Sequence, residues 1–395
     1  MKKLLIVSFL LFTFQGYSQH AIVQQLASEV NQDSLLTYVK QLTALLPVNT
    51  PSGPQLITSR LTGTAGNILT ATYIKQKLTS WGIAFDEINF SSTGQNIIAK
   101  IPGRRAEKIL MVGAHYDAVG TNNPLFHYPG ADDNASGTAA VLEAARVCAG
   151  KQFPVTLHFA FWDEEEQNLT GSRATAPNYN NNLIGYINHD MIAYDSNNDS
   201  SFDIHVRNVA NTLLLGDKIF NVVKLYNVPL KPRIINPGET ATDHGAFWQN
   251  NLTAVAVNEE YADEDDFNPN WHRMTDSITY FNIPYFVNMS RFATTAFLHL
   301  AMDTSPLLSI NKQSLVDDML QVYPNPFKQE FTLILNPQLH NVQVEVVDIT
   351  GTRVYQDNLT SGSHVVPFNQ PNGLYFLTVL HNGQIVGRKK VVKLN

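Results

Sequence analysis

Between Ala21 and Met302, short apolar runs alternate with amphipathic segments, and this alternation constrains the fold more than any other feature. The runs are almost continuously apolar, which is typical of strands that are covered on both faces. Strands alternating with helices predict a mixed, mainly parallel sheet with helices on both faces, a three-layer α/β/α sandwich. The clearest predicted strands are 108–117, 155–163, 183–194 and 252–260, and the clearest predicted helices are 68–82 and 134–150.

The pattern changes after this region. Residues 303–318 show neither the strand-like nor the helix-like spacing of apolar residues, and this predicts a linker. From 319 to 395 the chain consists of short strand-like runs separated by turn residues, which predicts a small C-terminal all-β sandwich. Its length is one at which independent domains occur. The predicted strands are 331–336, 342–349, 352–357, 363–368, 374–380 and 384–394.

The first 19 residues begin with two lysines followed by an apolar run that is short for a membrane span. This pattern predicts a secretory signal peptide over residues 1–19, which leaves 20–302 for the α/β domain. No other long apolar stretch follows, so we expect no stable membrane insertion after processing. The single cysteine, Cys148, excludes an intrachain disulfide. A formal net charge of −7 without a basic stripe argues against nucleic acid as a partner.

Polar clusters follow the predicted strands at the point where each strand ends. The carboxyl ends of parallel strands meet at one edge of a sheet, and ligands bind there in open α/β folds. Histidine with carboxylates is a ligand set suited to Zn²⁺. Two divalent ions ~3.5–4 Å apart repel by roughly 17–19 kcal/mol at an effective dielectric of ~20, and only several carboxylates offset that. The clusters are His115 with Asp117, Asp163–Glu166, His189 with Asp190, 259–272 with His272, and a fifth, 130–137, at a helix start.

The chain offers enough carboxylates for two ions, but spacing alone leaves open which of them bind metal. Between Arg60 and Leu300 the motifs resemble, in order, those of the co-catalytic dizinc exopeptidases, metallopeptidase family 28, which includes the bacterial leucyl aminopeptidases. The motifs are RLTGTAGN, NIIAKIPG, GAHYD, GADDNASGTAAVLE, FAFWDEEEQNLTGS, NHDMIAYD, TDHGAFW and NWHRMTD.

The resemblance implies two Zn²⁺ per chain and a role for each motif residue. Glu165 is implied to be the general base, and Asp117 to be the carboxylate partner of a ligand histidine. Asp243 and His244 are implied to contact substrate or to support the site. The resemblance also implies a cis peptide bond after the bridging residue. The implied ligands are His115 and Asp190 for one ion, Glu166 and His272 for the other, and Asp133 as the bridge.

The acidic run DEEE leaves two possible registers. Aligning the family pattern on Leu169, Gly171 and Ser172 places its glutamate pair at Glu165 and Glu166. Glu164 stands where the family has Gly or Ala, so Glu164 with Glu165 is the alternative pair. Asp163 and Glu164 are then interpreted as solvated groups or as hydrogen-bonding partners near the ligands. His158 and His189, on predicted strands, are interpreted as packing residues.

The function implied by the resemblance is a secreted zinc-dependent aminopeptidase that hydrolyses N-terminal residues from peptides by a metal-activated water. Alternatives on the same fold are a glutaminyl cyclase, a carboxypeptidase or another amide hydrolase. An alternative of another class is a non-catalytic, metal-stabilised binding protein. From about Met319 to Asn395, VYPNPF, VEVVDITGTRVYQ, NGLYFLTV and RKKVVKLN resemble the C-terminal sorting domain of the type IX secretion system. That resemblance implies the type IX machinery as a partner, and a secreted or cell-surface protein of an outer-membrane-bearing bacterium.

Overall fold

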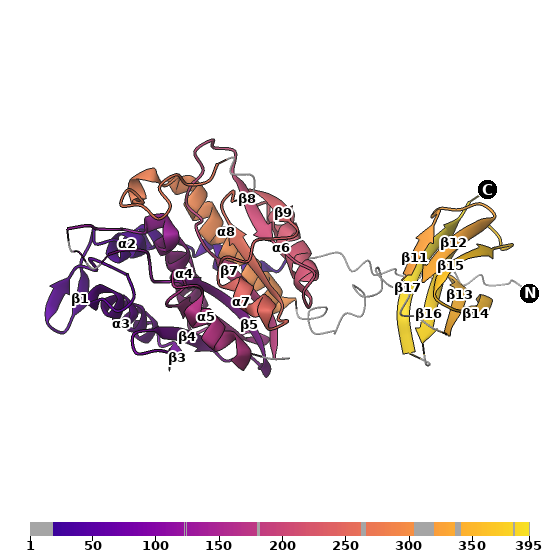
Figure 1. Cartoon of the computed structure of the whole chain (residues 1–395), viewed down its shortest axis with the longest axis horizontal. Coiled ribbons are helices and arrows are strands. Elements are labelled where there is room, and N and C mark those ends of the chain that lie inside the picture. The colour runs from indigo at the N-terminus through magenta and orange to yellow at the C-terminus, as the bar shows by residue number, and fades with distance from the viewer. Residues whose placement is uncertain are drawn as a thin grey trace, which may run out of the picture. The chain divides into compact units, whose positions relative to one another are not determined.

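The computed structural model describes residues 19–121, 123, 125–179, 182–261, 266–303, 320–335, 341–381 and 384–394. The predicted signal peptide lies outside these residues except for Gln19, and the predicted linker lies outside them except for Asp303. The chain divides into two compact units, Met1–Leu307 and Leu308–Asn395. Each unit is described by itself below (Figure 1).

The first unit is built on an eight-stranded sheet with the order β3-β4-β6-β5-β7-β10-β8-β9. The pairs β6–β5, β5–β7, β7–β10 and β8–β9 are parallel, and the other three pairs are antiparallel. The sheet is therefore mixed, with a parallel centre, as predicted. The strands are β3 (Ala84–Asn89), β4 (Gln95–Ile101), β5 (Arg105–His115), β6 (Val155–Trp162), β7 (Leu183–His189), β8 (Ser201–His205), β9 (Lys231–Ile235) and β10 (Ala254–Asn258), and β1 (Val48–Thr50) and β2 (Gly53–Gln55) form a separate hairpin.

Helices cover both faces of this sheet, which confirms the three-layer α/β/α prediction (Figure 1). Side chains three residues apart on β6 point to opposite faces. Phe159 packs on Phe297 of one helical layer, and Trp162 packs on Phe247 of the other. The helices are α1 (Ala21–Ser28), α2 (Gln32–Leu42), α3 (Ala65–Ser80), α4 (Gly137–Cys148), α5 (Thr170–Thr175), α6 (Thr212–Tyr226), α7 (His244–Gln249) and α8 (Ile283–Met302), with a π-helical turn, η1 (Ala131–Ser136), before α4.

The second unit consists of two antiparallel sheets, β11-β12-β15 and β14-β13-β16-β17. Alternate residues of β12 and β13 are buried, as expected for two sheets packed face to face. The all-β prediction is confirmed, and the first short strand was not predicted. The strands are β11 (Leu320–Tyr323), β12 (Glu330–Leu335), β13 (Val342–Asp348), β14 (Arg353–Leu359), β15 (Gly362–Pro367), β16 (Gly373–His381) and β17 (Gln384–Lys393).

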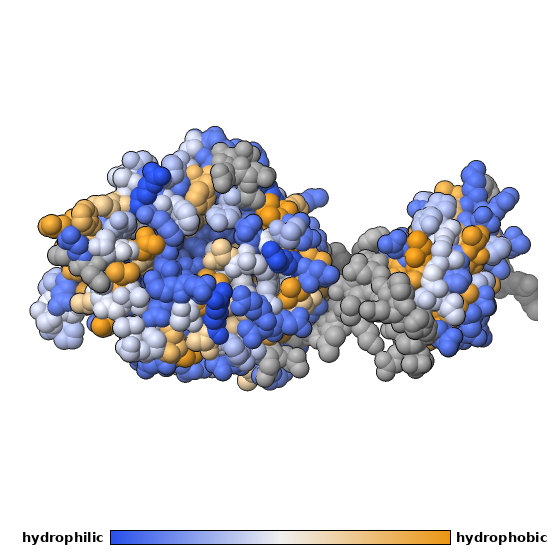
Figure 2. Space-filling model, viewed as in Figure 1, coloured by the Kyte–Doolittle hydropathy of each residue, from blue (hydrophilic) through white to orange (hydrophobic). Residues whose placement is uncertain are grey.

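Within the described part of the chain, no helix combines the length and the apolar character needed to cross a bilayer. On the face seen in Figure 2, apolar residues are scattered in small groups among hydrophilic ones.

Candidate metal centre

Three neighbouring parallel strands bring the central residues of the site together. His115 is the last residue of β5 and lies opposite Trp162, the last residue of β6. Asp190 directly follows β7, on the other side of β5. Asp133 lies in η1, whose buried turn precedes α4. The predicted meeting of these clusters at one edge of the sheet is therefore what the structure contains.

His115 and its neighbours form the first cluster of candidate ligands. Its Nε2 lies 3.2 Å from Asp133 Oδ1 and 3.2 Å from Asp190 Oδ1. Burial opposes a charged ring here, but Asp190 and Glu165 raise the pKa of His115 well above its usual value. Burial also raises the pKa of Asp190. The carboxylates around His115 thus favour its positively charged ring. An environment that stabilises positive charge in this way can also hold a bound cation.

His272 and its neighbours form the second cluster, on the other oxygen of the same aspartate. His272 Nε2 lies 3.2 Å from Asp133 Oδ2 and 2.9 Å from Glu166 Oε2. Although burial acts in the opposite sense, these two carboxylates raise the pKa of His272 to about 10. Burial raises the pKa of Glu166 to about 7, and Asp133 adds to the effect. Asp133 therefore presents one oxygen to each cluster, which is the geometry of a bridging ligand.

Asp117 and Glu165 lie beside the clusters without the same contacts. Asp117 accepts the backbone N–H groups of Glu165 and Glu166, each at 3.2 Å, and its Oδ1 is 3.4 Å from Nδ1 of His115. It thus orients a histidine and the acidic segment together. Glu165 Oε2 is 3.9 Å from His115 Nε2, and burial raises the pKa of Glu165 well above its usual value. A carboxyl group held near the ligands with a raised pKa is suited to carrying a proton. The peptide bond Asp133–Asn134 is cis, as the resemblance implied.

The other two residues of the acidic run, Asp163 and Glu164, face neutral donors and not a cation. Both are buried, so the interpretation as solvated groups is wrong. Asp163 accepts the side-chain amide of Asn67 at 2.9 Å and the N–H of Gln95 at 3.1 Å, and burial raises its pKa to about 7. Glu164 Oε1 accepts three hydroxyl groups, from Thr62 at 3.1 Å and from Ser91 and Thr93 at 3.0 Å each.

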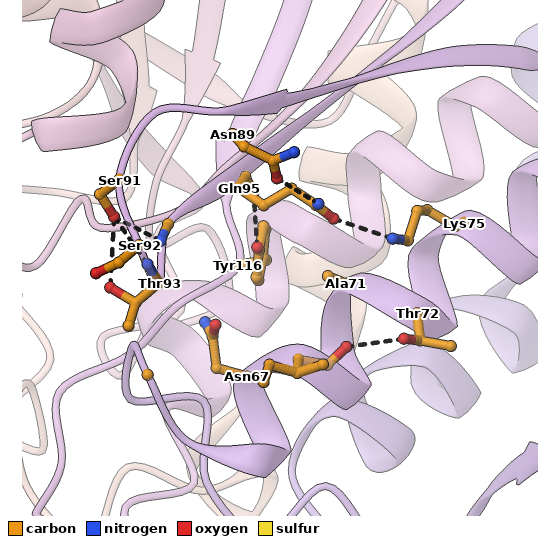
Figure 3. A pocket seen from close by; sticks show the side chains of 13 residues that line it. Asn67, Ala71, Thr72, Lys75, Asn89, Ser91, Ser92, Thr93, Gln95 and Tyr116 are labelled. Atoms are coloured by element: carbon orange, nitrogen blue, oxygen red, sulfur yellow. Dashed lines mark hydrogen bonds between the residues drawn. The ribbon is translucent and has the colours of Figure 1, made fainter.

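These bonds attach the acidic segment to the loop before β4. Next to that loop is a polar pocket of about 320 Å³, which Asn67, Thr93, Gln95 and Lys75 help to line (Figure 3). None of the candidate ligands lines this pocket. Asp163 and Glu164 therefore anchor the acidic segment to neighbouring polar side chains, whereas Glu165 and Glu166 approach the histidines. This division agrees with the register aligned on Leu169.

Arg60 was missed as a site residue, although its motif was recognised. Its guanidinium is 2% exposed and donates only to carbonyl oxygens. The acceptors are the oxygens of Tyr116 at 2.8 Å, Leu42 at 3.0 Å, Pro129 at 2.7 Å, Gly130 at 2.7 Å and Asp133 at 3.5 Å. Arg60 thus ties the backbone directly after His115 to the backbone that leads into Asp133.

Glycine is required at position 130, where the backbone passes close to Arg60 and Asp133. Its φ is +56°, and an added Cβ would lie 2.5 Å from the carbonyl oxygen of Asp133 and 2.8 Å from Arg60. Asp276 supports the same turn from the other side, because it accepts the N–H groups of Asp132 and Asp133 at 3.0 Å each. Two supporting residues lie in recognised motifs: Arg60 begins RLTGT, and Asp276 ends NWHRMTD. The sequence carries no further signal of their roles.

Asp243 and His244 were predicted to contact substrate or to support the site. His244 is buried, bonds to Thr242 Oγ1 and to the carbonyl of Glu239 at 2.8 Å each, and burial lowers its pKa to about 3. It therefore positions Thr242, which lines the ligand pocket. Asp243 is fully buried, and both of its oxygens lack a hydrogen-bond partner among the described residues. Burial raises the pKa of Asp243 to about 7.

Two other histidines serve the fold. Burial lowers the pKa of His158 to about 4, and its Nδ1 lies 3.0 Å from the hydroxyl of Tyr179. Burial also lowers the pKa of His189 to about 3. Both are buried, in agreement with packing roles.

The two clusters open into one pocket of about 410 Å³. Trp271 stacks on the His272 ring, with 3.8 Å between ring centroids. The described side chains that complete the pocket include Met191, Tyr261, Asn258, Leu169 and Arg173.

Comparisons with known proteins agree with this geometry. Residues 96–296 match Peptidase family M28, and residues 321–393 match the secretion system C-terminal sorting domain. Leucine aminopeptidase 1 of Arthroderma otae is 33% identical over 213 residues, which are 50% of this chain and 55% of that protein. The chain thus spans about half the length of the curated relatives it matches.

Solved structures share the fold at low sequence identity. The LapA aminopeptidase of Legionella pneumophila is 18% identical, with a TM-score of 0.63 over 73% of this chain and 76% of that one. The glutaminyl cyclase of Porphyromonas gingivalis is also 18% identical, with a TM-score of 0.54 over 68% of this chain and 97% of that one. The family match covers the region that carries His115, Asp133, Glu166, Asp190 and His272, and we conclude that the chain belongs to peptidase family M28 and ends in a secretion system C-terminal sorting domain.

Proposed function

We propose that the first unit is a zinc-dependent aminopeptidase that removes N-terminal residues from peptides outside the cell. The observation that carries the proposal is the shared aspartate: His115 and His272 approach different oxygens of Asp133 at 3.2 Å each. The relatives named leucine aminopeptidase support the reaction class, and membership of a peptidase family supports hydrolysis.

The residues present fit two Zn²⁺ ions. His115 and Asp190 would hold one, His272 and Glu166 the other, and Asp133 would bridge them. Three carboxylates supply three negative charges, and a bridging hydroxide would balance the remaining charge of two divalent ions. When bound, the ions would polarise the scissile carbonyl and lower the pKa of a shared water.

The protein's own residues would then manage the proton and the geometry. Glu165 Oε2 lies 3.9 Å from His115 Nε2, farther than the oxygens of Asp133 and Asp190 at 3.2 Å each, so of these carboxylates it is the one that would be left to accept a proton from the water. It would return that proton to the leaving amine. Asp117 would hold the peptide N–H groups of Glu165 and Glu166, and so keep the base and a ligand in a fixed relation.

A glutaminyl cyclase is the second candidate, because a cyclase shares this fold. We expect a cyclase on this fold to need one metal ion. The second cluster, His272 with Glu166 on the far oxygen of Asp133, favours the two-metal hydrolase. A carboxypeptidase and a non-catalytic binding protein stay as further outcomes of the same test.

The test combines metal analysis with turnover. The purified protein is assayed on aminoacyl amides, on C-terminally blocked and free peptides, and on peptides with N-terminal glutamine, with and without chelator. The variants are Glu165→Gln, Glu166→Gln and, as a control, Glu107→Gln, an exposed residue of β5 away from the site. We expect two metal ions per chain, and turnover of aminoacyl amides that chelation abolishes.

Each variant has a distinct expected result. Glu165→Gln should keep both ions and lose about 10²–10⁴-fold in rate. Glu166→Gln should lose metal as well as activity, and Glu107→Gln should match the wild type. Cyclisation of N-terminal glutamine with one ion would replace the proposal by the cyclase. Metal loss in Glu165→Gln but not in Glu166→Gln would move the register to Glu164 and Glu165.

We also propose that the second unit directs export, so that the enzyme is secreted or attached to the cell surface through the type IX machinery. The match of residues 321–393 to the sorting domain supports this localisation. Cell fractionation tests it: a chain lacking 319–395 should stay in the periplasm, and its normal export would contradict the proposal.

A further inference from the structure

The ligand pocket contains one basic side chain that the metal site does not use. Apart from His272, Arg173 is the only basic residue among the described lining residues. The carboxylates of the pocket, Asp133, Glu165, Glu166 and Asp190, are those assigned to metal ions or to the proton. Once the metal charge is balanced, the formal charges left facing a bound molecule are those of Arg173 and of the base, Glu165.

The local backbone fixes the position of Arg173 relative to the base. Leu169 donates its N–H to the carbonyl of Glu165 at 2.8 Å, and Arg173 donates its N–H to the carbonyl of Leu169 at 2.9 Å. Two successive four-residue turns therefore connect the base to Arg173. All three residues line the same pocket. A displacement of Arg173 would require this hydrogen-bonded segment to move with it.

The guanidinium of Arg173 is available for a ligand. Arg173 is exposed, and among the described residues no hydrogen bond or ion pair to its side chain is present. Lys75, which lines the other pocket, is different because its Nζ already contacts Glu87 at 2.8 Å and Gln95 at 3.0 Å. A guanidinium has a planar fork of donors that matches a carboxylate.

We infer that Arg173 binds a carboxylate of the substrate on the side of the scissile bond away from the N-terminus. The inference rests on the proposed function, because it assumes that the free amine of the substrate binds beside the carboxylates of the pocket. A cube of about 410 Å³ has an edge of about 7 Å. One residue spans ~3.3–3.6 Å, so about two residues fit, and the C-terminal carboxylate of a dipeptide lies within the pocket.

Two groups offer this chemistry: the C-terminal carboxylate of a dipeptide, and the acidic side chain of the second residue in a longer peptide. The experiment separates them with four substrates: Leu-Gly, Leu-Gly amide, Leu-Asp amide and Leu-Asn amide. Values of kcat/KM are measured for the wild type, Arg173→Met, Arg173→Lys and Arg173→Gln. The control is Arg104→Met, an exposed arginine that precedes β5 at the strand end opposite to His115.

We expect the wild type to prefer Leu-Gly to its amide, or Leu-Asp amide to Leu-Asn amide, by about tenfold, the range of an exposed charged hydrogen bond. Arg173→Met and Arg173→Gln should abolish the preference mainly through KM. Arg173→Lys should retain part of it, and Arg104→Met all of it. Added salt should weaken the preference of the wild type. Which substrate pair responds identifies the source of the carboxylate.

The failures of the two proposals are distinguishable. If the wild type cleaves all four substrates and Arg173→Met changes no ratio between them, the inference is wrong and the aminopeptidase stands. If the wild type cleaves none of them while it binds its metal, the proposed function itself is wrong. Equal losses of Arg173→Met on all four substrates would also overturn the inference, because such a loss would mark a structural role.

Discussion

Replacing Arg60 should reveal how much of the site depends on one buried cation. Four of its bonds to carbonyl oxygens are 3.0 Å or shorter, and the guanidinium is 2% exposed. At about 1 kcal/mol net for each bond, Arg60→Met should lower the free energy of unfolding by about 4 kcal/mol. For a unit of this size, that corresponds to a fall in Tm of about 8–16 °C.

The metal site should respond as well, since Arg60 holds the carbonyl of Gly130 and that of Asp133 itself. Loss of a group that supports a ligand costs about 10–100-fold in metal affinity. Arg60→Lys keeps the charge with fewer donors, so it should lie between the wild type and Arg60→Met. Arg104→Met, which removes an exposed arginine, should change stability by less than about 0.5 kcal/mol.

The assay is thermal unfolding of the chelated and zinc-loaded proteins, with metal affinity measured by competition with a chromogenic chelator. Unfolding of the chelated form separates backbone support from metal stabilisation. The reasoning would be refuted if chelated Arg60→Met melted within about 2 °C of the wild type, the scale of a surface substitution. It would also be refuted if Arg60→Met lost stability while its metal affinity stayed the same, because the link to Asp133 would then be absent.

Further substitutions test other parts of the first unit. Glu164→Ala removes the acceptor shared by three hydroxyl groups, so urea unfolding should show a loss of about 1–3 kcal/mol, and less for Glu164→Gln; an unchanged midpoint would restore the solvated interpretation. Burial lowers the pKa of His158 to about 4, below ~6.5 in the unfolded chain. The contribution of neutral His158 to the free energy of unfolding is therefore complete above about pH 6.5 and is lost as the pH falls toward 4. His158→Gln should flatten this pH dependence of the unfolding free energy, and an identical slope would count against it. Deleting residues 319–395 should leave the Tm and turnover of the purified first unit within error, because the second unit has its own core, which includes Phe331, Val344 and Leu377; a lower Tm would show that the units depend on each other.

The layers, the second unit and the sheet edge at which the polar clusters meet could all be predicted from the sequence. The apolar runs that end at His115 and Trp162 specify strands, because the period of the side chains is a local property. Parallel neighbours place their carboxyl ends together, so His115 and Asp190 could be predicted to meet from order alone. Within the acidic run the family motif favoured Glu165 and Glu166 as the functional pair, and that assignment stays a prediction.

Only the tertiary structure decided what the remaining charges face. The sequence left Asp163 and Glu164 either as solvated groups or as hydrogen-bonding partners near the ligands; the structure supports the second interpretation, because their partners come from Thr62, Asn67 and the loop at 91–95. Arg60 gave no signal of its role, because its acceptors are backbone carbonyls, which every residue carries. The physical reason is the same in each case. A one-dimensional pattern encodes whether a side chain is buried, but the partner of a buried charge is set by which distant segments pack against it, and that depends on the register of the whole sheet and its helices.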